Sequence, residues 1–291
     1  MMTIRSWQVA GTALLCCVFG SFAAPPTTTI DMTGVQGAVM GGVYTSPYLA
    51  TVGGVSNTDV ICDDFADNTY INETWTAYEI NLGQLSQYSS YLTQYAPTIN
   101  APDGSSENYQ MFSGSDPGLA NFDSVYFCPT GTCSSTNPND VLLNQSQAYA
   151  VEAYLAEDLL SIDQSTVAGQ TLAGEVSFAM WGVFDYQALY PGSQYDDLTA
   201  AEQTAARNIL ASAGQYILAN NLTASDYSNV TLYAWNGVTP APSSACGGTC
   251  GAPQQLMSVT MAEPSSPALL AADMLAVFGL IAIFRKRIVR G

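Results

Sequence analysis

The sequence predicts an α+β protein, in which an antiparallel β-sheet or sandwich carries a three-helix insertion. Between the two ends lie residues 24–262, which we call the body. Short β-branched and aromatic runs occupy the first and last parts of the body, and helical periodicity occupies its middle. Both ends of the 291-residue chain also carry apolar segments, which predict an N-terminal signal peptide and a C-terminal transmembrane helix.

The first part of the body, from about residue 28 to residue 82, is predicted to form strands. Its β-branched and aromatic runs cover residues 39–44, 48–52, 58–62 and 75–80, and Gly, Ser and Asn separate them. The next region, residues 84–139, is polar and rich in Ser and Tyr, and it gives few secondary-structure signals.

Helical spacing begins at about Ala150. Apolar residues recur every three or four positions over residues 150–162, whereas Glu152, Glu157 and Asp158 lie largely off this stripe. We therefore expect Glu152 on the helix surface, and we expect the same of Glu175 in a second helix over residues 167–184.

A third helix begins at a capping box formed by Thr199 and Glu202 and runs to about residue 219. Strands return at residues 230–235 and 255–259. The sequence has no internal repeat, and residues 24–262 are predicted to form a single exported domain.

The composition excludes several classes of function. The chain has a formal net charge of −18 and no histidine, which rules out Ser-His-Asp and Cys-His catalysis and imidazole metal ligands. Only Glu263 and Asp273 of the 24 acidic residues lie outside residues 24–262, where Arg207 is the single base. A body this acidic cannot neutralise phosphates, so nucleic acid is excluded as a partner. The absence of lysine there excludes Schiff-base chemistry.

Residues 1–23 have the layout of a secretory signal peptide. Arg5 supplies the positive start, residues 9–22 are almost wholly apolar, and the small residues Ser21 and Ala23 predict cleavage after Ala23. The polar stretch that follows ends the apolar run too early for a permanent membrane anchor.

The C-terminal residues 263–291 contain a membrane segment and a basic end. Residues 268–284 would form a helix of about 25 Å, a little short for a hydrocarbon core of about 30 Å. Residues 285–291 are basic and predict a cytoplasmic tail with the body outside. An ordinary tail anchor is one interpretation of this segment.

A more specific interpretation rests on the order of three parts: Glu263-Pro264-Ser265, the short apolar helix, and Arg285-Lys286-Arg287. This order resembles the PEP-CTERM sorting signal of Gram-negative bacteria, although Ala262 replaces the first Pro of the signature. The resemblance implies processing by an exosortase near Glu263 and Pro264, after membrane tethering of the precursor. It also implies delivery to the cell surface or an extracellular polysaccharide matrix.

Five of the seven cysteines remain after loss of the signal peptide, in an oxidising compartment. Cys128 and Cys133 are close enough in sequence to form a disulfide, and so are Cys246 and Cys250. A zinc site with these four thiolates is the alternative. Cys62, the fifth cysteine, belongs to neither arrangement.

Cys62 ends a predicted strand, Ala179 and Trp181 lie on a predicted helix, and Gln254 and Gln255 open a late strand. This order resembles the thioester domains of bacterial surface adhesins, which have a strand cysteine, a helical Thr-Gln-x-Ala-aliphatic-Trp motif and a late strand glutamine. Val176 and Ser177 replace the Thr-Gln pair here.

This resemblance implies a Cys–Gln thioester between Cys62 and Gln254 or Gln255, which captures an amine covalently. Such a bond must be shielded from water, and Phe65 and Trp181 are candidates for the shield. The alternative is that Cys62 is an ordinary buried core residue.

Acidic residues follow Cys62 closely. Asp63, Asp64 and Asp67, with Glu73 further on, offer hard oxygen ligands for Ca²⁺, although the sequence does not fit the EF-hand loop. A solvated acidic loop is the alternative. No other cofactor is expected.

We expect an exported, non-enzymatic protein of the cell surface or matrix of a Gram-negative bacterium. Its expected partners are an exosortase-type processing enzyme and an exopolysaccharide or surface matrix. Two alternatives stay open. One is a covalent adhesin that uses Cys62, and the other is an extracellular glycan hydrolase that uses two carboxylates among Asp63, Asp64, Glu152 and Glu175.

Overall fold

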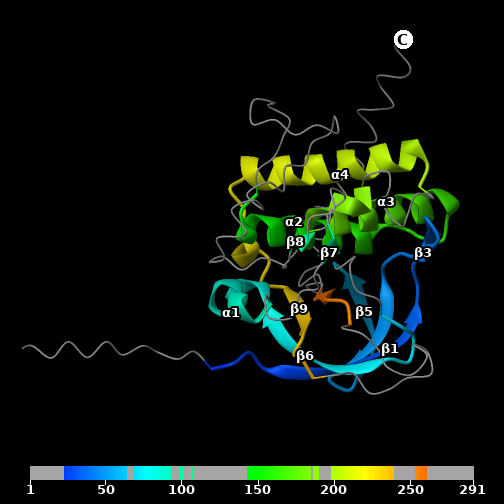
Figure 1. Cartoon of the computed structure of the whole chain (residues 1–291). Helices are drawn as coiled ribbons and strands as arrows, with labels where there is room; N and C mark the ends of the chain where they lie inside the picture. The colour runs from blue at the N-terminus through cyan, green and yellow to red at the C-terminus, as the bar shows by residue number, and fades with distance from the viewer. Residues whose placement is uncertain are drawn as a thin grey trace, which may run out of the picture.

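A computed structural model gives the fold of the chain. It describes residues 23–63, 69–92, 99–100, 106–107, 143–184, 186–189, 198–238 and 253–260. Within these residues the protein has the predicted mixed α+β architecture, with a strand-rich part and a helical part (Figure 1).

The strand-rich part is a closed antiparallel barrel of six strands, in the order β1-β4-β5-β10-β9-β6. The strands are β1 (Thr27–Val35), β4 (Tyr48–Val52), β5 (Val55–Cys62), β10 (Leu256–Val259), β9 (Val230–Trp235) and β6 (Thr74–Asn81). Antiparallel pairing was predicted, as a sheet or sandwich. Pairing of β1 with both β4 and β6 instead closes the sheet on itself.

Side-chain alternation explains how the barrel fills its interior. Ile30 pairs with Val52 on one side and with Trp75 on the other, and all three side chains are buried. Because successive strand residues point to opposite faces, these paired positions place one face of each strand inside the barrel.

Short elements connect and flank the barrel strands. These are the hairpin of β2 (Val39–Met40) and β3 (Val43–Tyr44), the helices η1 (Leu82–Gln84) and α1 (Leu85–Leu92), the small sheet of β7 (Ile99–Asn100) and β8 (Ser106–Glu107), and the 3-10 helices η3 (Tyr186–Leu189) and η4 (Ala224–Asp226). Gly41 and Gly42 turn the β2–β3 hairpin with φ values of 56° and 78°, which side chains other than glycine rarely adopt.

Three long helices follow between β8 and β9, as predicted. They are α2 (Gln145–Ser161), α3 (Val167–Phe184) and α4 (Ala200–Ala219). Figure 1 shows them gathered on one side of the barrel. The capping box at Thr199 is confirmed, since Glu202 N donates to Thr199 Oγ1 and Thr199 N donates to Glu202 Oε2. A second capping box, between Asn144 and Gln147, starts α2 five residues before the predicted Ala150.

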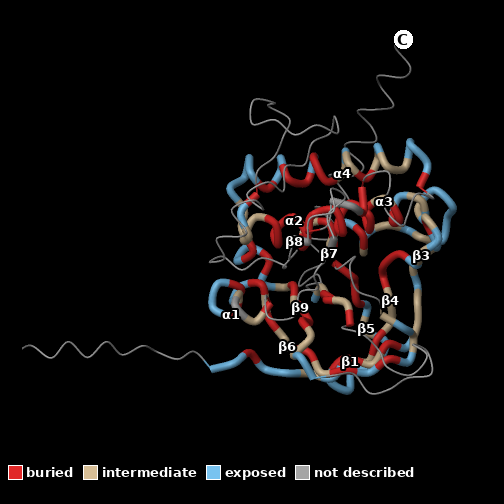
Figure 2. Tube along the Cα trace, viewed as in Figure 1, coloured by how far each residue is buried: buried red, intermediate tan, exposed pale blue. Residues whose placement is uncertain are grey.

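The helices differ in how far they are buried. Figure 2 shows α2 and α3 buried along much of their length, whereas α4 alternates between buried and exposed positions. Helix α2 is buried because it contacts α3, α4, η4 and β10, which cover more than one of its faces.

No helix in the described part of the chain has both the length and the apolar character needed to cross a bilayer. The predicted signal peptide ends at residue 23, and only that residue is described; the predicted membrane helix, residues 268–284, and the basic tail lie outside the described residues.

Candidate functional site

Cys62 is the last residue of β5, and neighbouring side chains hold its backbone. Its N–H donates to Ser46 Oγ at 3.0 Å, and Trp181 Nε1 donates to its carbonyl oxygen at 3.0 Å. The Cys62 thiol is buried, and the residue has 0 % of its surface exposed. Trp181 therefore links helix α3 directly to the end of β5.

The pairing of β5 with β10 distinguishes the two candidate glutamines. Leu256 lies opposite Cys62 and Met257 lies opposite Ile61. Gln254 and Gln255 lie just before β10, and the contact of Gln255 with Asp63 continues the register by one residue. Gln254 lines the same pocket as Leu256, on the side of Cys62, whereas Gln255 points to the other face. Gln254 is the diagonal cross-strand neighbour of Cys62, a position within reach of a long side chain.

The hydrogen bonds of Gln255 confirm that it points to the other face. Its Nε2 donates to Asp63 Oδ2 at 2.8 Å and to the Tyr149 hydroxyl at 3.4 Å. Asp63 and Gln255 are one residue beyond the last pair of the ladder, so this contact continues the register of the two strands.

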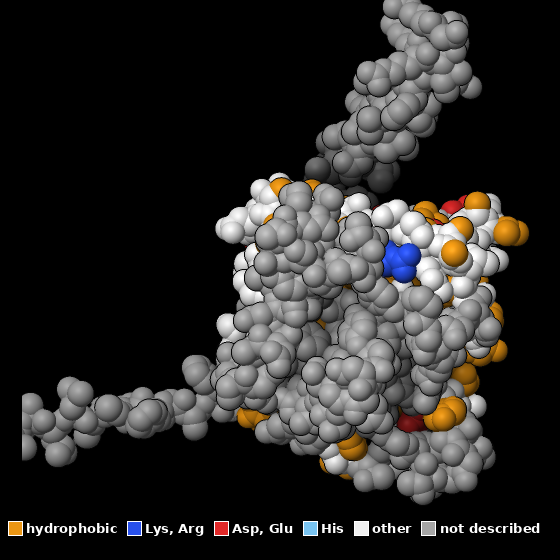
Figure 3. Space-filling view, turned by 45° about the horizontal axis from the view of Figure 1, so that its top comes forward, with side chains coloured by type: hydrophobic (Ala, Val, Ile, Leu, Met, Phe, Trp, Pro, Cys, Tyr) orange, Lys and Arg blue, Asp and Glu red, His pale blue; other side chains and the backbone are white. Residues whose placement is uncertain are grey.

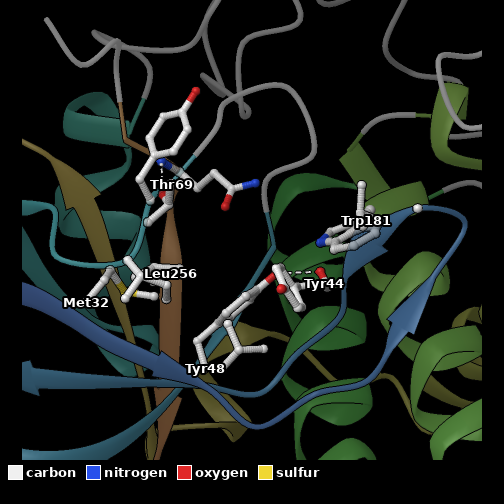
Figure 4. A pocket seen from close by; sticks show the side chains of 12 residues that line it. Met32, Tyr44, Tyr48, Thr69, Trp181 and Leu256 are labelled. Carbon is white, nitrogen blue, oxygen red and sulfur yellow. Dashed lines mark hydrogen bonds between the residues drawn. The ribbon is translucent and has the colours of Figure 1, made fainter. Parts of the chain in front are cut away.

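A pocket of about 400 Å³ opens on the face that carries Gln254 and Leu256. Figure 4 shows Met32, Leu256 and Thr69 on one side of it and Tyr44 and Trp181 on the other. The twelve residues that line it are mostly apolar or aromatic: Met32, Val35, Gly42, Val43, Tyr44, Tyr48, Thr69, Tyr70, Ile71, Trp181, Gln254 and Leu256.

The lining of this pocket is ordered by hydrogen bonds. The Tyr48 hydroxyl donates to the Tyr44 carbonyl oxygen at 2.7 Å, and Gln254 N donates to Thr69 Oγ1 at 3.0 Å. Tyr44 belongs to the β2–β3 hairpin and is 58 % exposed, whereas Trp181 is 3 % exposed. The pocket thus runs from an exposed tyrosine at the hairpin to the buried tryptophan that contacts Cys62.

Glu152 of α2 lies in a fully buried position, so its predicted place on the helix surface is wrong. It has 0 % exposure, and neither of its carboxyl oxygens has a hydrogen-bond partner among the described residues. Burial, and in second place the charge of Asp63, raise the pKa of Glu152 well above its usual range. The helical period placed Glu152 off the apolar stripe, but contacts on several sides of α2 bury it anyway.

The predicted calcium ligands are only partly described. Asp63 is fully buried, its Oδ2 accepts a hydrogen bond from Gln255, and Asp64 and Asp67 lie outside the described residues. Glu73 is also buried, its Oε2 accepts a hydrogen bond from Tyr70 N at 3.0 Å, and burial raises its pKa. Among the described residues, no group of three or more acidic or cysteine side chains could hold a metal ion.

The carboxylates proposed for glycan hydrolysis are not arranged around an open cleft in the described part of the chain. Asp63 and Glu152 have 0 % exposure, so a polysaccharide chain cannot contact them in this arrangement. Glu175 lies on α3, where burial and the charge of Glu202 raise its pKa.

Several other predicted residues lie outside the described residues. They are Phe65, the cysteines Cys128, Cys133, Cys246 and Cys250, and the sorting-signal residues Glu263, Pro264, Ser265, Arg285, Lys286 and Arg287.

The single base of the body does not belong to the pocket. Arg207 donates from Nη1 to the Leu189 carbonyl oxygen at 3.0 Å and from Nη2 to Thr204 Oγ1 at 3.4 Å. Figure 3 shows one small basic area on the face in view.

Comparison with known proteins gives no relative from which a function could be transferred. No protein-family model matches the chain, and no curated protein or solved structure is significantly similar to it.

Proposed function

We propose that the exported body is a covalent capture protein of the cell surface or extracellular matrix, and that Cys62 and Gln254 form its internal thioester. The observation that supports this proposal best is the register of β5 and β10. It places Cys62 opposite Leu256, with Gln254 on the same face at the diagonal position.

The proposed bond forms by a balanced acyl transfer. The Cys62 sulfur attacks the side-chain carbonyl carbon of Gln254, so that a C–S bond forms and the C–N bond of the carboxamide breaks. The thiol proton leaves with the NH2 group as ammonia, which takes up a further proton from water to become ammonium. A primary amine of the target then attacks the same carbon, which forms an amide and returns the thiol to Cys62.

The surroundings of Cys62 support such a bond. A thioester hydrolyses when water reaches it, and the Cys62 side chain is completely buried. Trp181, which was proposed as a shield, contacts the Cys62 backbone and lines the pocket at the same time. Gln254, whose side-chain carbonyl carbon the amine would attack, lines this pocket, whereas Cys62 is not among the described lining residues.

The export part of the proposal comes from the sequence. Residues 1–23 would direct secretion, residues 263–291 would tether the precursor and present it to an exosortase, and the released body would act outside the cell. A capture protein in a matrix fits this route, because it needs no cytoplasmic cofactor or energy source.

Non-covalent binding to a matrix component is the second candidate. The aromatic side chains of Tyr44, Tyr48, Tyr70 and Trp181 around the pocket favour it, because such rings stack against sugars and bind cations.

Labelling with a biotinylated primary amine tests the proposal. We expect the wild-type body to become labelled at Gln254, and the Cys62→Ala and Gln254→Ala variants to remain unlabelled. Gln255→Ala probes the adjacent position: it keeps the Gln254 carboxamide and should still become labelled at Gln254, although more slowly, because it removes the hydrogen bond to Asp63. Equal labelling of wild type and Cys62→Ala would overturn the covalent mechanism and leave the non-covalent candidate.

A further inference from the structure

A buried polar cluster lies on the other side of the same two strand ends, and the proposed chemistry does not use it. It consists of Asp63, Gln255, and Tyr149 and Glu152 of α2. The exposure of these four residues does not exceed 4 %. The inference drawn from this cluster rests on the proposed thioester function.

The contact between Asp63 and Gln255 ties the two strands together next to the proposed bond. Asp63 follows Cys62 and Gln255 follows Gln254, so each member of the contact is the chain neighbour of a reacting residue. The hydrogen bond from Gln255 Nε2 to Asp63 Oδ2, at 2.8 Å, connects the two strand ends through their side chains. A shift of this contact would shift Cys62 against Gln254.

Glu152 is the unusual member of the cluster. A buried carboxyl group without a hydrogen-bond partner is costly, and a folded protein rarely keeps one without a reason. Both Glu152 oxygens are in this state within the described part of the chain. If Glu152 were ionised as well as Asp63, two carboxylates would repel each other at the strand end.

The other charged groups on the elements that pack against α2 are engaged elsewhere. On α3, Glu175 interacts with Glu202 of α4, and Glu202 itself caps that helix. Arg207 of α4 donates to the Leu189 carbonyl oxygen, and Asp226 of η4 accepts a hydrogen bond from Thr223 N. Strand β10 carries no titratable side chain. Asp63 is therefore the charged group that acts on Glu152 among the described residues.

We propose that Glu152 is a positioning residue. While Glu152 keeps its proton, the hydrogen bond between Gln255 and Asp63 stays intact and holds Cys62 and Gln254 in the geometry for thioester formation. The cluster then carries one negative charge, on Asp63, which accepts the Gln255 amide. Loss of the Glu152 proton adds a second negative charge, which repels Asp63 and displaces it from its hydrogen bond with Gln255. The pair thereby makes thioester formation sensitive to pH, although Glu152 does not touch the reacting atoms.

The test compares Glu152→Gln and Asp63→Ala with Asp158→Asn, a matched control at an exposed position of the same helix. Each unfolded chain is reduced and refolded at a series of pH values, and the fraction one ammonia lighter than the sequence mass is followed with time. Asp63→Ala removes the acceptor of the Gln255 amide and should slow thioester formation by about ten- to a hundredfold, since a displacement of about 1 Å can cost about a hundredfold in rate.

Glu152→Gln should give a different result, because glutamine is neutral at every pH. We expect thioester formation at low pH close to that of wild type, together with loss of the decline that wild type shows as the pH rises and Glu152 ionises. In the Cys62→Ala background, infrared spectra should show a protonated carboxyl band at neutral pH that disappears in Glu152→Gln. Asp158→Asn should match wild type in both measurements.

Three outcomes would overturn the inference in distinguishable ways. A wild-type protein without any thioester overturns the proposed function and the positioning role with it. A wild-type thioester that forms at the same rate and with the same pH profile in Glu152→Gln and Asp63→Ala overturns the positioning role alone. Absence of the carboxyl band overturns the protonated state on which that role depends.

Discussion

The two sides of the β5–β10 strand pair differ sharply in chemistry. On the side of Cys62, Leu256 and Gln254, the surroundings are apolar and aromatic and a pocket opens. On the opposite side, Asp63 and Gln255 meet a buried tyrosine and a buried acid of α2.

This difference shows how one pair of strand ends can serve two purposes. Strand alternation places neighbouring residues on opposite faces, so a reactive residue can be kept away from charge while its neighbour makes polar contacts. An ionised carboxylate beside a thioester would attract water, whereas on the reverse face it can only affect geometry. The predictions below test the two sides separately.

The largest effect is expected on the pocket side. Trp181→Ala should lower the free energy of unfolding by about 3–5 kcal/mol, because it removes a large buried aromatic side chain. The same change removes the bond to the Cys62 carbonyl oxygen. Denaturant unfolding of the purified body measures the loss, and a loss below about 1 kcal/mol would show that Trp181 is not part of the core.

The polar side should respond in the opposite direction. Glu152→Leu should raise the free energy of unfolding at pH 7 by about 1–3 kcal/mol, because it removes a carboxyl group that is buried without a hydrogen-bond partner. Denaturant unfolding measures this gain, with Asp158→Asn as the control. A loss of stability would mean that the Glu152 carboxyl group is well satisfied, and the contrast between the two sides would fail.

The pH dependence of stability should reveal the same carboxyl group. The pKa of Glu152 is raised above its reference value of 4.5, so the folded state binds more protons than the unfolded state above that pH. The stabilising contribution of this proton is complete below about pH 4.5 and is lost as the pH rises through the raised pKa. Denaturant unfolding at several pH values should therefore show a decline that is smaller in Glu152→Gln, and equal declines would contradict the assignment.

The smallest effect separates the hydrogen bond of Trp181 from its bulk. Trp181→Phe keeps most of the apolar volume but cannot donate to the Cys62 carbonyl oxygen, so we expect a loss of about 0.5–1.5 kcal/mol from the missing bond. If the loss equals that of Trp181→Ala, the core contact and the hydrogen bond cannot be separated. Parallel unfolding curves of the two variants decide this.

The features that were predicted correctly depend on local sequence. Helix α3 begins and ends at the predicted residues 167 and 184, and α4 begins after the predicted cap at Thr199. Strand β9 likewise covers the predicted residues 230–235. Periodicity and capping act over a few residues, so one sequence is sufficient to recognise them.

The features that were missed depend on contacts between distant residues. Closure of the barrel requires β1 to pair with β6, whose paired residues are 43 to 51 positions apart in the chain, and no local signal reports it. The choice between Gln254 and Gln255 required the register of β10 against β5. Predicting the burial of Glu152 would have required knowing that α2 is covered on several sides. Six consecutive residues of α2, from Ala148 to Ala153, are in fact buried.

The central claim concerns a single covalent bond, and the intact mass of residues 24–262 tests it most directly. The protein is purified from a host with an export pathway, denatured at mild acid pH under reducing conditions, and weighed beside Cys62→Ala. We predict that the wild-type body weighs one ammonia less than its sequence and that the variant has its full sequence mass. A full-mass wild-type body that also takes up no amine would contradict the thioester and leave Cys62 as a core residue.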